Sequence, residues 1–182
     1  MTENFGILPS GETATLYTIT NGHITASVTD YGATLVRLFV PDASGNPADI
    51  VLGYDDCNGY RTANGACLGA TVGRNANRLK GAKFTYKDTE YTLAQNDGAN
   101  NLHSGPDYFH LRLWKTVKHA SNSVTFELHS PDGDQGFPGN AIIRVTYSLD
   151  DNGGLHIIYD ALCDKDTVFN MTNHSYFNLT GH

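Results

Sequence analysis

The sequence has few cysteines and no long apolar run, and each of these absences excludes a class of protein. Its three cysteines, Cys57, Cys67 and Cys163, are odd in number and lack C-x-x-C spacing, which argues against a disulfide framework or a thiolate metal site. No uninterrupted apolar segment is long enough to cross a bilayer, and residues 1–6 do not resemble a secretory leader. The sequence therefore predicts a cytoplasmic protein with no membrane partner.

Positive charge is also scarce. Lys and Arg total 12 against 19 Asp and Glu, which gives a formal net charge of −7 at pH 7, and there is no Lys/Arg run. Because a phosphate backbone requires a basic surface, nucleic acid is not expected as a partner, and a neutral small molecule fits the charge better. With 182 residues and 40% hydrophobic side chains, the chain can build the core of one domain.

Short β-type runs occupy the sequence in place of helical periodicity. They cover residues 14–20, 24–29, 34–40, 83–86, 91–94, 113–118, 123–129, 142–149, 155–161 and 168–171. Turn-forming residues separate them, for example Asn21-Gly22 and Lys87-Asp88. The nearest helical candidate is one or two turns within residues 55–64. This pattern predicts an all-β protein, either a large antiparallel sandwich or a barrel.

Residues 73–78 combine two arginines with two asparagines. Guanidinium and carboxamide groups can donate several directed hydrogen bonds to hydroxyl oxygens, so the cluster suits a polyhydroxylated ligand. The alternative is a surface loop whose arginines pair with nearby carboxylates. Residues 98–108 and 131–139 form loops that are long for hairpin connections, and both are candidate binding loops.

Two histidines are candidates for proton transfer. His103 lies in a turn-rich segment that can direct its ring into a cleft, although a solvent-exposed histidine is the alternative. His174 lies at the end of an expected strand, close to Tyr176, with Asn173 and Ser175 in position to fix its tautomer by hydrogen bonding. For His174 the alternative is a core histidine with satisfied hydrogen bonds.

A metal site built from the histidines is not expected. The candidates would be His103, His110, His174 and His182, and they show neither helical H-x-x-x-H spacing nor an H-x-H pair on a strand. No carboxylate accompanies them at a metal-ligand interval. The sequence therefore predicts chemistry without a metal.

Six segments taken together resemble the aldose 1-epimerases, the galactose mutarotase family. They are residues 31–35 (YGATL), 68–74 (LGATVGR), 76–79 (ANRL), 101–105 (NLHSG), 132–139 (DGDQGFPG) and 172–179 (TNHSYFNL). The segments follow the family's order and extend over nearly the whole chain. The resemblance implies an antiparallel β-supersandwich, galactose mutarotase-like and incomplete here, with residues 1–182 as the N-terminal portion of one domain. It also implies a reaction without a cofactor.

The resemblance assigns roles by position. His174 matches the family's proton donor to the sugar ring oxygen. His103, Asn77 and Arg78 match groups that hold the sugar and polarise the same region. His174 and His103 are therefore the expected catalytic residues, and His103 is expected to bind the substrate as well.

The expected substrate is a free aldohexose such as galactose or glucose, with Ser175 and Tyr176 lining its pocket. In the implied reaction an acid protonates the ring oxygen O5 while a base removes the proton of the C1 hydroxyl group. The C1–O5 bond then opens, C1 rotates by half a turn, and ring closure yields the other anomer.

Family members are nearly twice as long, and their catalytic base is a glutamate in a C-terminal half that has no counterpart here. Losing a general base costs about 10²–10⁴-fold in rate, so the chain alone is expected to be a weak catalyst. The alternatives are a truncated product, a split enzyme completed by a complementary C-terminal chain, or a noncatalytic carbohydrate-binding module.

A relative that acts on hexose 6-phosphates is a further alternative. It would require additional cationic side chains to hold the phosphate. Arg61, Arg74 and Arg112 are scattered in the sequence and do not argue for it.

Overall fold

The computed structural model describes residues 1–181, apart from the side chain of Asn64, and most of its regular structure is β-strand. His182, one of the histidines considered as a metal ligand, lies outside the described residues. None of the helices within residues 1–181 has the length and apolar character that spanning a membrane requires.

The first sheet contains five strands in the order β1-β2-β3-β4-β5, and every neighbouring pair is antiparallel. Its strands are β1 (Thr2–Ile7), β2 (Thr13–Thr20), β3 (Thr25–Thr29), β4 (Thr34–Pro41) and β5 (Pro47–Asp49). Ala14 and Leu16 on β2 are buried on one face of the strand, in a smaller apolar cluster with Cys57 and Tyr60, and Ile19 is buried on the other face, in the main core. The sheet is a simple meander of sequential strands.

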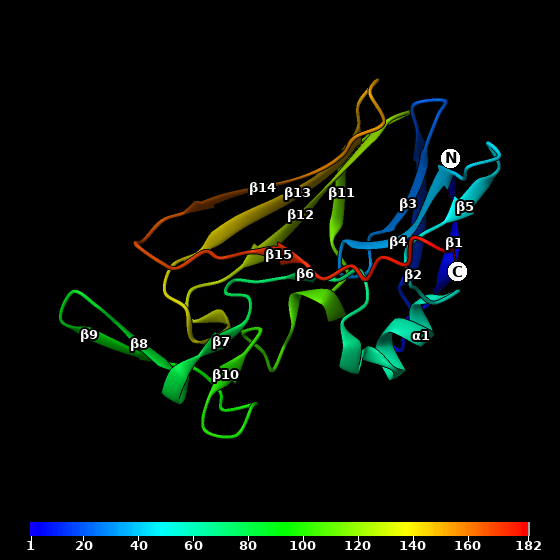
Figure 1. Cartoon of the computed structure of the whole chain (residues 1–182). Coiled ribbons are helices and arrows are strands. Elements are labelled where there is room, and N and C mark those ends of the chain that lie inside the picture. Colours follow the sequence, from blue (N-terminus) through cyan, green and yellow to red (C-terminus); the bar gives the residue numbers. More distant parts are fainter. Residues whose placement is uncertain (182) are drawn as a thin grey trace.

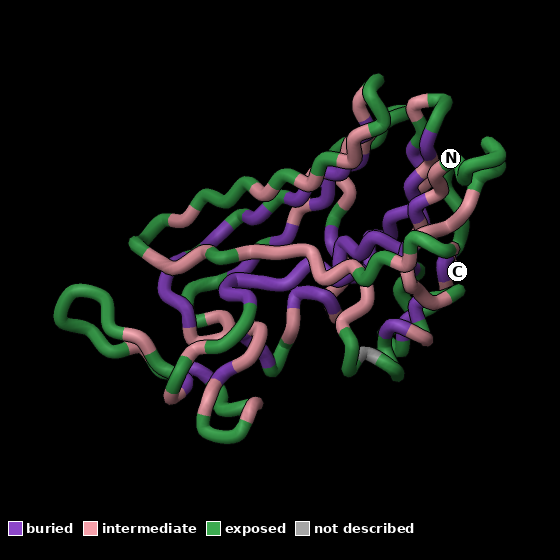
Figure 2. The backbone as a smooth tube through the Cα atoms, in the orientation of Figure 1, coloured by how far each residue is buried: buried purple, intermediate pink, exposed green. Residues whose placement is uncertain are grey.

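The second sheet contains four antiparallel strands in the order β11-β12-β13-β14. They are β11 (Lys115–Ala120), β12 (Ser123–Ser130), β13 (Ala141–Leu149) and β14 (Leu155–Cys163). Strand β13 alternates regularly, with Ile143, Val145 and Tyr147 fully buried and Ile142 and Arg144 exposed. β14 is an edge strand whose residues are exposed or half-buried (Figure 2).

The two sheets pack against each other across the main core (Figures 1 and 2). Leu35 and Val28 from the first sheet lie in the same apolar cluster as Phe126 and Val145 from the second, together with Trp114 from the connecting segment. Burial of each such side chain stabilises the fold by about 1.5–3 kcal/mol. The structure therefore confirms an all-β sandwich.

Short elements connect and cover these sheets. The strands are β6 (Thr71–Val72), β7 (Arg78–Leu79), β8 (Lys83–Tyr86), β9 (Thr89–Thr92), β10 (Asn101–Leu102) and β15 (Thr172–Asn173). The helices are α1 (Cys57–Thr62) and the 3-10 turns η1 (Asn64–Ala66), η2 (Lys80–Ala82), η3 (Phe109–Leu111) and η4 (Asp134–Gly136). The β8–β9 hairpin projects from the body of the molecule (Figure 1), whereas β6 and β15 cross its centre.

Most of the expected strands are present, and three differ in extent. β9 begins at Thr89 because the Lys87-Asp88 turn is only two residues long and places Thr89 opposite Tyr86. β11 begins at Lys115 because the preceding residues bind the first sheet: Leu113 pairs with Tyr31, and the Trp114 N–H donates to the Asp30 carbonyl oxygen.

The third difference lies in residues 168–171, which do not form a strand. Within this segment only Asn170 makes a β-type pairing, an isolated parallel bridge with Asn75. Phe169 and Met171 instead pack against the main core, and regular pairing begins at β15. The helix expected within residues 55–64 is α1, capped by the Asp56 carboxylate.

Candidate active site

Residues 69–78 form the central segment of the site, and residues 170–174 lie along one side of it. Strand β15 pairs with β6, with Thr172 opposite Val72. The His174 N–H donates to the Ala70 carbonyl oxygen at 2.8 Å, and the Gly69 N–H donates to the His174 carbonyl oxygen at 3.2 Å. These bonds fix the backbone of His174 against the core.

Residues 101–104 hold the other side of the central segment. The Ser104 hydroxyl group accepts from the Asn75 N–H at 2.9 Å and donates to the Asn75 carbonyl oxygen at 3.0 Å, and both residues are buried. The fully buried Asn101 amide donates to the carbonyl oxygens of Ala94 and Ser104. The loop that carries His103 is therefore fixed by buried hydrogen bonds on both sides of the histidine.

Asn77 and His103 add two further hydrogen bonds between the central segment and the loop that carries His103. The Asn77 N–H donates to Nδ1 of His103 at 3.0 Å, and the His103 N–H donates to the Asn77 carbonyl oxygen at 3.0 Å. Both residues adopt a positive φ, 62° and 58°. Because Nδ1 accepts, the neutral His103 ring carries its proton on Nε2.

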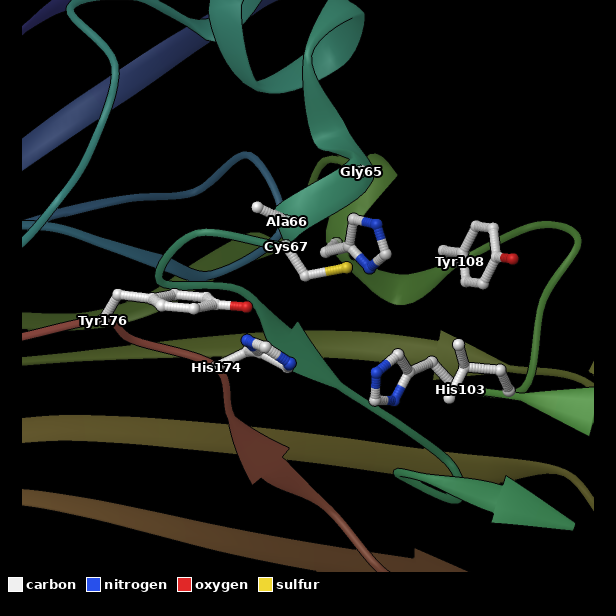
Figure 3. Close-up of a pocket in the computed structure, with 9 residues that line it drawn as sticks. Gly65, Ala66, Cys67, His103, Tyr108, His174 and Tyr176 are labelled. Carbon is white, nitrogen blue, oxygen red and sulfur yellow. The ribbon is translucent and has the colours of Figure 1, made fainter. Parts of the chain in front are cut away.

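The central segment thus brings His103 and His174 together from distant parts of the sequence. Their ring centroids are 5.4 Å apart and the rings are nearly perpendicular, at 89°. The Tyr176 ring lies 5.2 Å from that of His174 on the other side. Figure 3 shows these three rings and the sulfur atom of Cys67 around one space.

Two hollows meet at this histidine pair. The smaller hollow, of about 200 Å³, is lined by Gly65, Ala66, Cys67, Leu102, His103, Tyr108, His110, His174 and Tyr176. The larger hollow, of about 590 Å³, is lined by Ala76, Asn77, Arg78, Leu102, His103, Asn170, Met171, Thr172 and His174. His103 and His174 line both, so a ligand in either hollow lies against the two imidazoles.

The electrostatics favour an uncharged His103. Burial lowers the pKa of His103, and the nearby His174 and Arg78 lower it further by repelling a second positive charge. A neutral His103 whose Nδ1 is occupied presents Nε2–H as a hydrogen-bond donor. Such a donor can polarise an oxygen atom of a bound ligand.

Asn77 and Arg78 lie on the wall of the larger hollow. The Arg78 Nε atom is 2.7 Å from an Asp97 carboxylate oxygen, and the Arg78 side chain is largely exposed. The ion pair orients the guanidinium group beside the hollow without burying it. The structure therefore places together five of the residues expected at the site: Asn77, Arg78, His103, His174 and Tyr176.

Ser175 and Asn173 differ from their expected placement. Ser175 lines neither hollow, and its buried hydroxyl oxygen has no hydrogen-bond partner among the described residues. Asn173 does not bond the His174 ring within the described part of the chain; its amide donates to the Gly69 carbonyl oxygen at 2.9 Å and to the Tyr147 hydroxyl group at 3.2 Å. Asn173 thus attaches the strand to the core and does not set the histidine tautomer.

Arg74 has a structural role, although its cluster suggested ligand binding. Its side chain is completely buried. Its acceptors are the carbonyl oxygens of Ser130, Pro131, Pro138 and Gly139 and the hydroxyl groups of Ser130 and Thr167. The long loop 131–139 therefore encloses a guanidinium group and does not line either hollow.

Several lining residues were not expected at the site, among them Cys67, Tyr108 and His110. His110 was considered only as a metal ligand, and within residues 1–181 no group of three or more His, Cys, Asp or Glu side chains is arranged to hold a metal. Nothing in the local sequence marks these residues, because they reach the smaller hollow from a 3-10 turn and two loops.

Comparison with known proteins identifies the class to which this fold and site belong. Residues 15–182 match the family model for aldose 1-epimerase, and the chain therefore belongs to the aldose 1-epimerase family. It is 38% identical over 182 residues to the aldose 1-epimerase of Escherichia coli (strain K12). It is 41% identical over 178 residues to the galactose mutarotase of Bos taurus.

Solved structures agree with this assignment. The GalM/aldose epimerase homologue from C. elegans superposes with a TM-score of 0.85 at 38% identity, over 90% of this chain and 50% of that one. The galactose 1-epimerase from Lactobacillus acidophilus NCFM gives a TM-score of 0.84 at 27% identity, over 98% of this chain and 52% of that one. The galactose mutarotase-like fold is thereby confirmed.

The chain spans about half the length of the curated relatives it matches, 52% of the E. coli protein and 51% of the bovine one. Among the residues that line the two hollows there is no carboxylate. The described part of the site therefore offers imidazoles, a guanidinium group and two carboxamides, but no Asp or Glu at the hollows.

Proposed function

We propose that this chain carries the acid and part of the sugar-binding surface of an aldose 1-epimerase. The complete site would interconvert the α and β anomers of free hexoses such as galactose or glucose, without a cofactor. The observation that carries the proposal is the meeting of His103 and His174 at two hollows also lined by Asn77 and Arg78. Membership of the aldose 1-epimerase family supports it.

The proposed roles combine the family resemblance with the geometry of the histidine pair. His174 protonates the ring oxygen O5, which makes that oxygen the leaving group from C1. His103 donates from Nε2–H to the same region of the sugar, in agreement with its occupied Nδ1 and its lowered pKa. Asn77 and Arg78 hold hydroxyl groups in the larger hollow.

The base that removes the C1 hydroxyl proton would come from a complementary C-terminal polypeptide. Two observations support this part of the proposal: the chain matches only about half of its relatives, and no carboxylate lines the hollows within residues 1–181. The two groups must act from different sides of the sugar, and a second polypeptide covering the open hollows would place a carboxylate opposite His174.

A carbohydrate-binding module is the second candidate, and the same lack of a carboxylate at the described hollows favours it. A hexose 6-phosphate is a poorer substrate candidate. Arg74 is buried in its own loop, and Arg112 is paired with Asp107 and Asp134. Neither Arg74 nor Arg112 is therefore available for a phosphate group at the hollows.

A cytoplasmic location is part of the proposal. Cys57, Cys67 and Cys163 are all free thiols, and Cys57 is buried. Free thiols are typical of proteins that work in a reducing compartment.

Polarimetry tests the proposed function. The 182-residue chain is compared with a chimera in which it is followed by the portion of the E. coli relative that it does not match. We expect the chimera to accelerate mutarotation of freshly dissolved α-galactose at least 100-fold more than the chain alone, because it regains a general base. A chain that binds galactose while the chimera stays inactive would instead support the binding module.

A further inference from the structure

His110 is a buried imidazole of the smaller hollow that the proposed mechanism does not use. It lies in η3 (Phe109–Leu111) and is only 7% exposed, yet it lines the same hollow as His103, His174 and Tyr176. Its ring stacks on the Tyr108 ring with centroids 5.0 Å apart and an interplanar angle of 29°. The orientation of the imidazole is therefore fixed before any ligand arrives.

The backbone at His110 is held as firmly as its ring. A Cβ atom on Gly32 would lie 2.4 Å from the His110 carbonyl oxygen, so η3 packs directly on the turn between β3 and β4. Next to His110, the Phe109 carbonyl oxygen accepts from the Trp114 indole N–H at 3.0 Å. Such a rigid setting is what a binding group requires for directed hydrogen bonds.

No side-chain hydrogen bond of the described residues involves a ring nitrogen of His110, and neither nitrogen is among the fully buried side-chain atoms that lack a partner. The ring nitrogens are therefore accessible from the hollow that His110 lines, and a rigidly held imidazole with accessible nitrogens can hydrogen-bond a ligand there. Side chains that serve only packing are commonly phenylalanine or leucine, which carry no polar atom to satisfy.

We infer that His110 is a further substrate-contacting residue, which holds one hydroxyl group of the hexose from the inner wall of the smaller hollow. The inference rests on the proposed function, since it assigns a third imidazole to the same sugar site. A neutral imidazole offers one donor and one acceptor on nitrogens that point apart, and either one can bond a sugar hydroxyl group. The role is in recognition of the sugar and involves no proton transfer.

The protonation of His110 agrees with this role. Burial lowers the pKa of His110 to about 4, and the nearby His103 and His174 contribute to the shift. The ring is therefore neutral at pH 7 and does not compete with His174 for a proton. A charged third imidazole would also repel a protonated His174 across the hollow.

A purely structural role is the competing explanation. A small cavity of about 10 Å³ lies behind His110, lined in part by Thr34, Tyr60 and Cys67. A water molecule there could satisfy the ring without any sugar. In that case His110 would affect the stability of the fold but would not distinguish one sugar hydroxyl group from another.

The test compares dissociation constants of the 182-residue chain for galactose and for its 2-, 3-, 4- and 6-deoxy analogues. The variants are His110→Phe, which keeps the stacking on Tyr108 but removes both ring nitrogens, and His110→Gln, which keeps a donor and an acceptor. His23→Gln, at an exposed turn of the first sheet, is the matched control. Thermal melting without sugar verifies that each variant is folded.

We expect His110→Phe to weaken galactose binding by about 5- to 30-fold, as for loss of a buried hydrogen bond. His110→Gln should retain most of the affinity. One deoxy analogue lacks the hydroxyl group that His110 contacts. For that analogue, His110→Phe and wild type should have the same affinity.

Two results would overturn the inference. If folded His110→Phe binds galactose as tightly as wild type does, His110 does not contact the sugar. If His110→Phe weakens the binding of galactose and of all four analogues by the same factor, the role of His110 is structural. In both cases the wild-type chain still binds galactose, so the proposed function stands. A wild-type chain that binds no hexose would overturn the proposed function, and this inference with it.

Discussion

Asn77 and His103 bind each other through two hydrogen bonds, each 3.0 Å long, which join the Asn77 N–H to Nδ1 of His103 and the His103 N–H to the Asn77 carbonyl oxygen. One bond fixes the spacing of two loops, and the other fixes the tautomer of a ring at the site. Because both residues have a positive φ, the pair depends on backbone conformations that most side chains disfavour. The position of the His103 ring therefore depends on the identity of residue 77.

Replacement of Asn77 separates this backbone requirement from sugar binding. Asn77 has a φ of 62°, which glycine adopts freely and alanine does not. We expect Asn77→Ala to lower the free energy of unfolding by about 1 kcal/mol in urea denaturation, with Asn77→Gly close to wild type. Equal stability of the two variants would show that the positive φ is not what residue 77 contributes.

Asn77→Gly also isolates the carboxamide group. The variant keeps the N–H that His103 requires and loses only the side chain at the larger hollow. Its affinity for galactose, measured by calorimetric titration, should fall several-fold while its stability does not.

Replacement of Arg74 should lower the stability of the fold, whereas replacement of Arg78 should weaken sugar binding. Arg74→Met leaves several buried carbonyl oxygens without donors, so we expect a loss of at least ~3 kcal/mol in the free energy of unfolding. Arg78→Met removes only the surface pair with Asp97 and should change stability by about 1 kcal/mol or less. Sugar affinity, measured on folded protein, should fall for Arg78→Met. An Arg74→Met variant as stable as wild type would contradict the role of its loop.

Gly32 should tolerate alanine far less well than Gly22 does. Both glycines have a positive φ, 73° and 91°, but a Cβ atom on Gly32 would meet the His110 carbonyl oxygen at 2.4 Å whereas one on Gly22 meets nothing within 4 Å. Gly22→Ala therefore pays only backbone strain, about 1 kcal/mol, and Gly32→Ala adds a steric shift of η3. We expect a loss of about 3 kcal/mol for Gly32→Ala in urea denaturation. Equal losses would argue against close packing of η3.

Acid should destabilise the protein through His110. The pKa of His110 is about 4 in the folded chain and 6.5 as an ordinary histidine, so the unfolded chain binds a proton first as the pH falls. Stability from a neutral His110 is complete above pH 6.5 and is lost between pH 6.5 and pH 4, by about 3 kcal/mol in total.

Asp30 acts in the opposite direction over part of the same range. Burial raises the pKa of Asp30 from 3.8 to about 6, so its protonation adds stability as the pH falls from 6 towards 3.8. The wild-type profile contains both effects, and the difference between wild type and His110→Phe isolates that of His110. Urea denaturation at pH 7.5 and pH 4.5 should show that the stability difference depends on pH. A difference independent of pH would contradict the neutral, buried state of His110.

The sequence predicted the elements whose signal is local. Strand β13 alternates buried side chains with exposed or half-buried ones without interruption, so its period of two is visible in the sequence alone. Asn77, Arg78, His103 and His174 were found because they lie in segments that resemble one family, and the structure brings all four to the same pair of hollows.

The roles that were missed depend on residues distant in sequence. Arg74 has the composition of a binding residue, and only the fold of loop 131–139 around it reveals a buried structural group. His110 becomes buried because η3 packs on Gly32, a contact that no local pattern records. Side-chain periodicity carries information about one strand, whereas such enclosure depends on several elements at once.

The most direct test of the account measures mutarotation of α-galactose by the chimera described above, with wild-type residues and with His174→Gln. Glutamine preserves the approximate volume and can donate a hydrogen bond, but it cannot transfer a proton to O5. The account predicts that His174→Gln lowers the rate at saturating sugar by about 10²–10⁴-fold while galactose binding changes little. A variant that retains the wild-type rate would contradict the assignment of His174 as the acid.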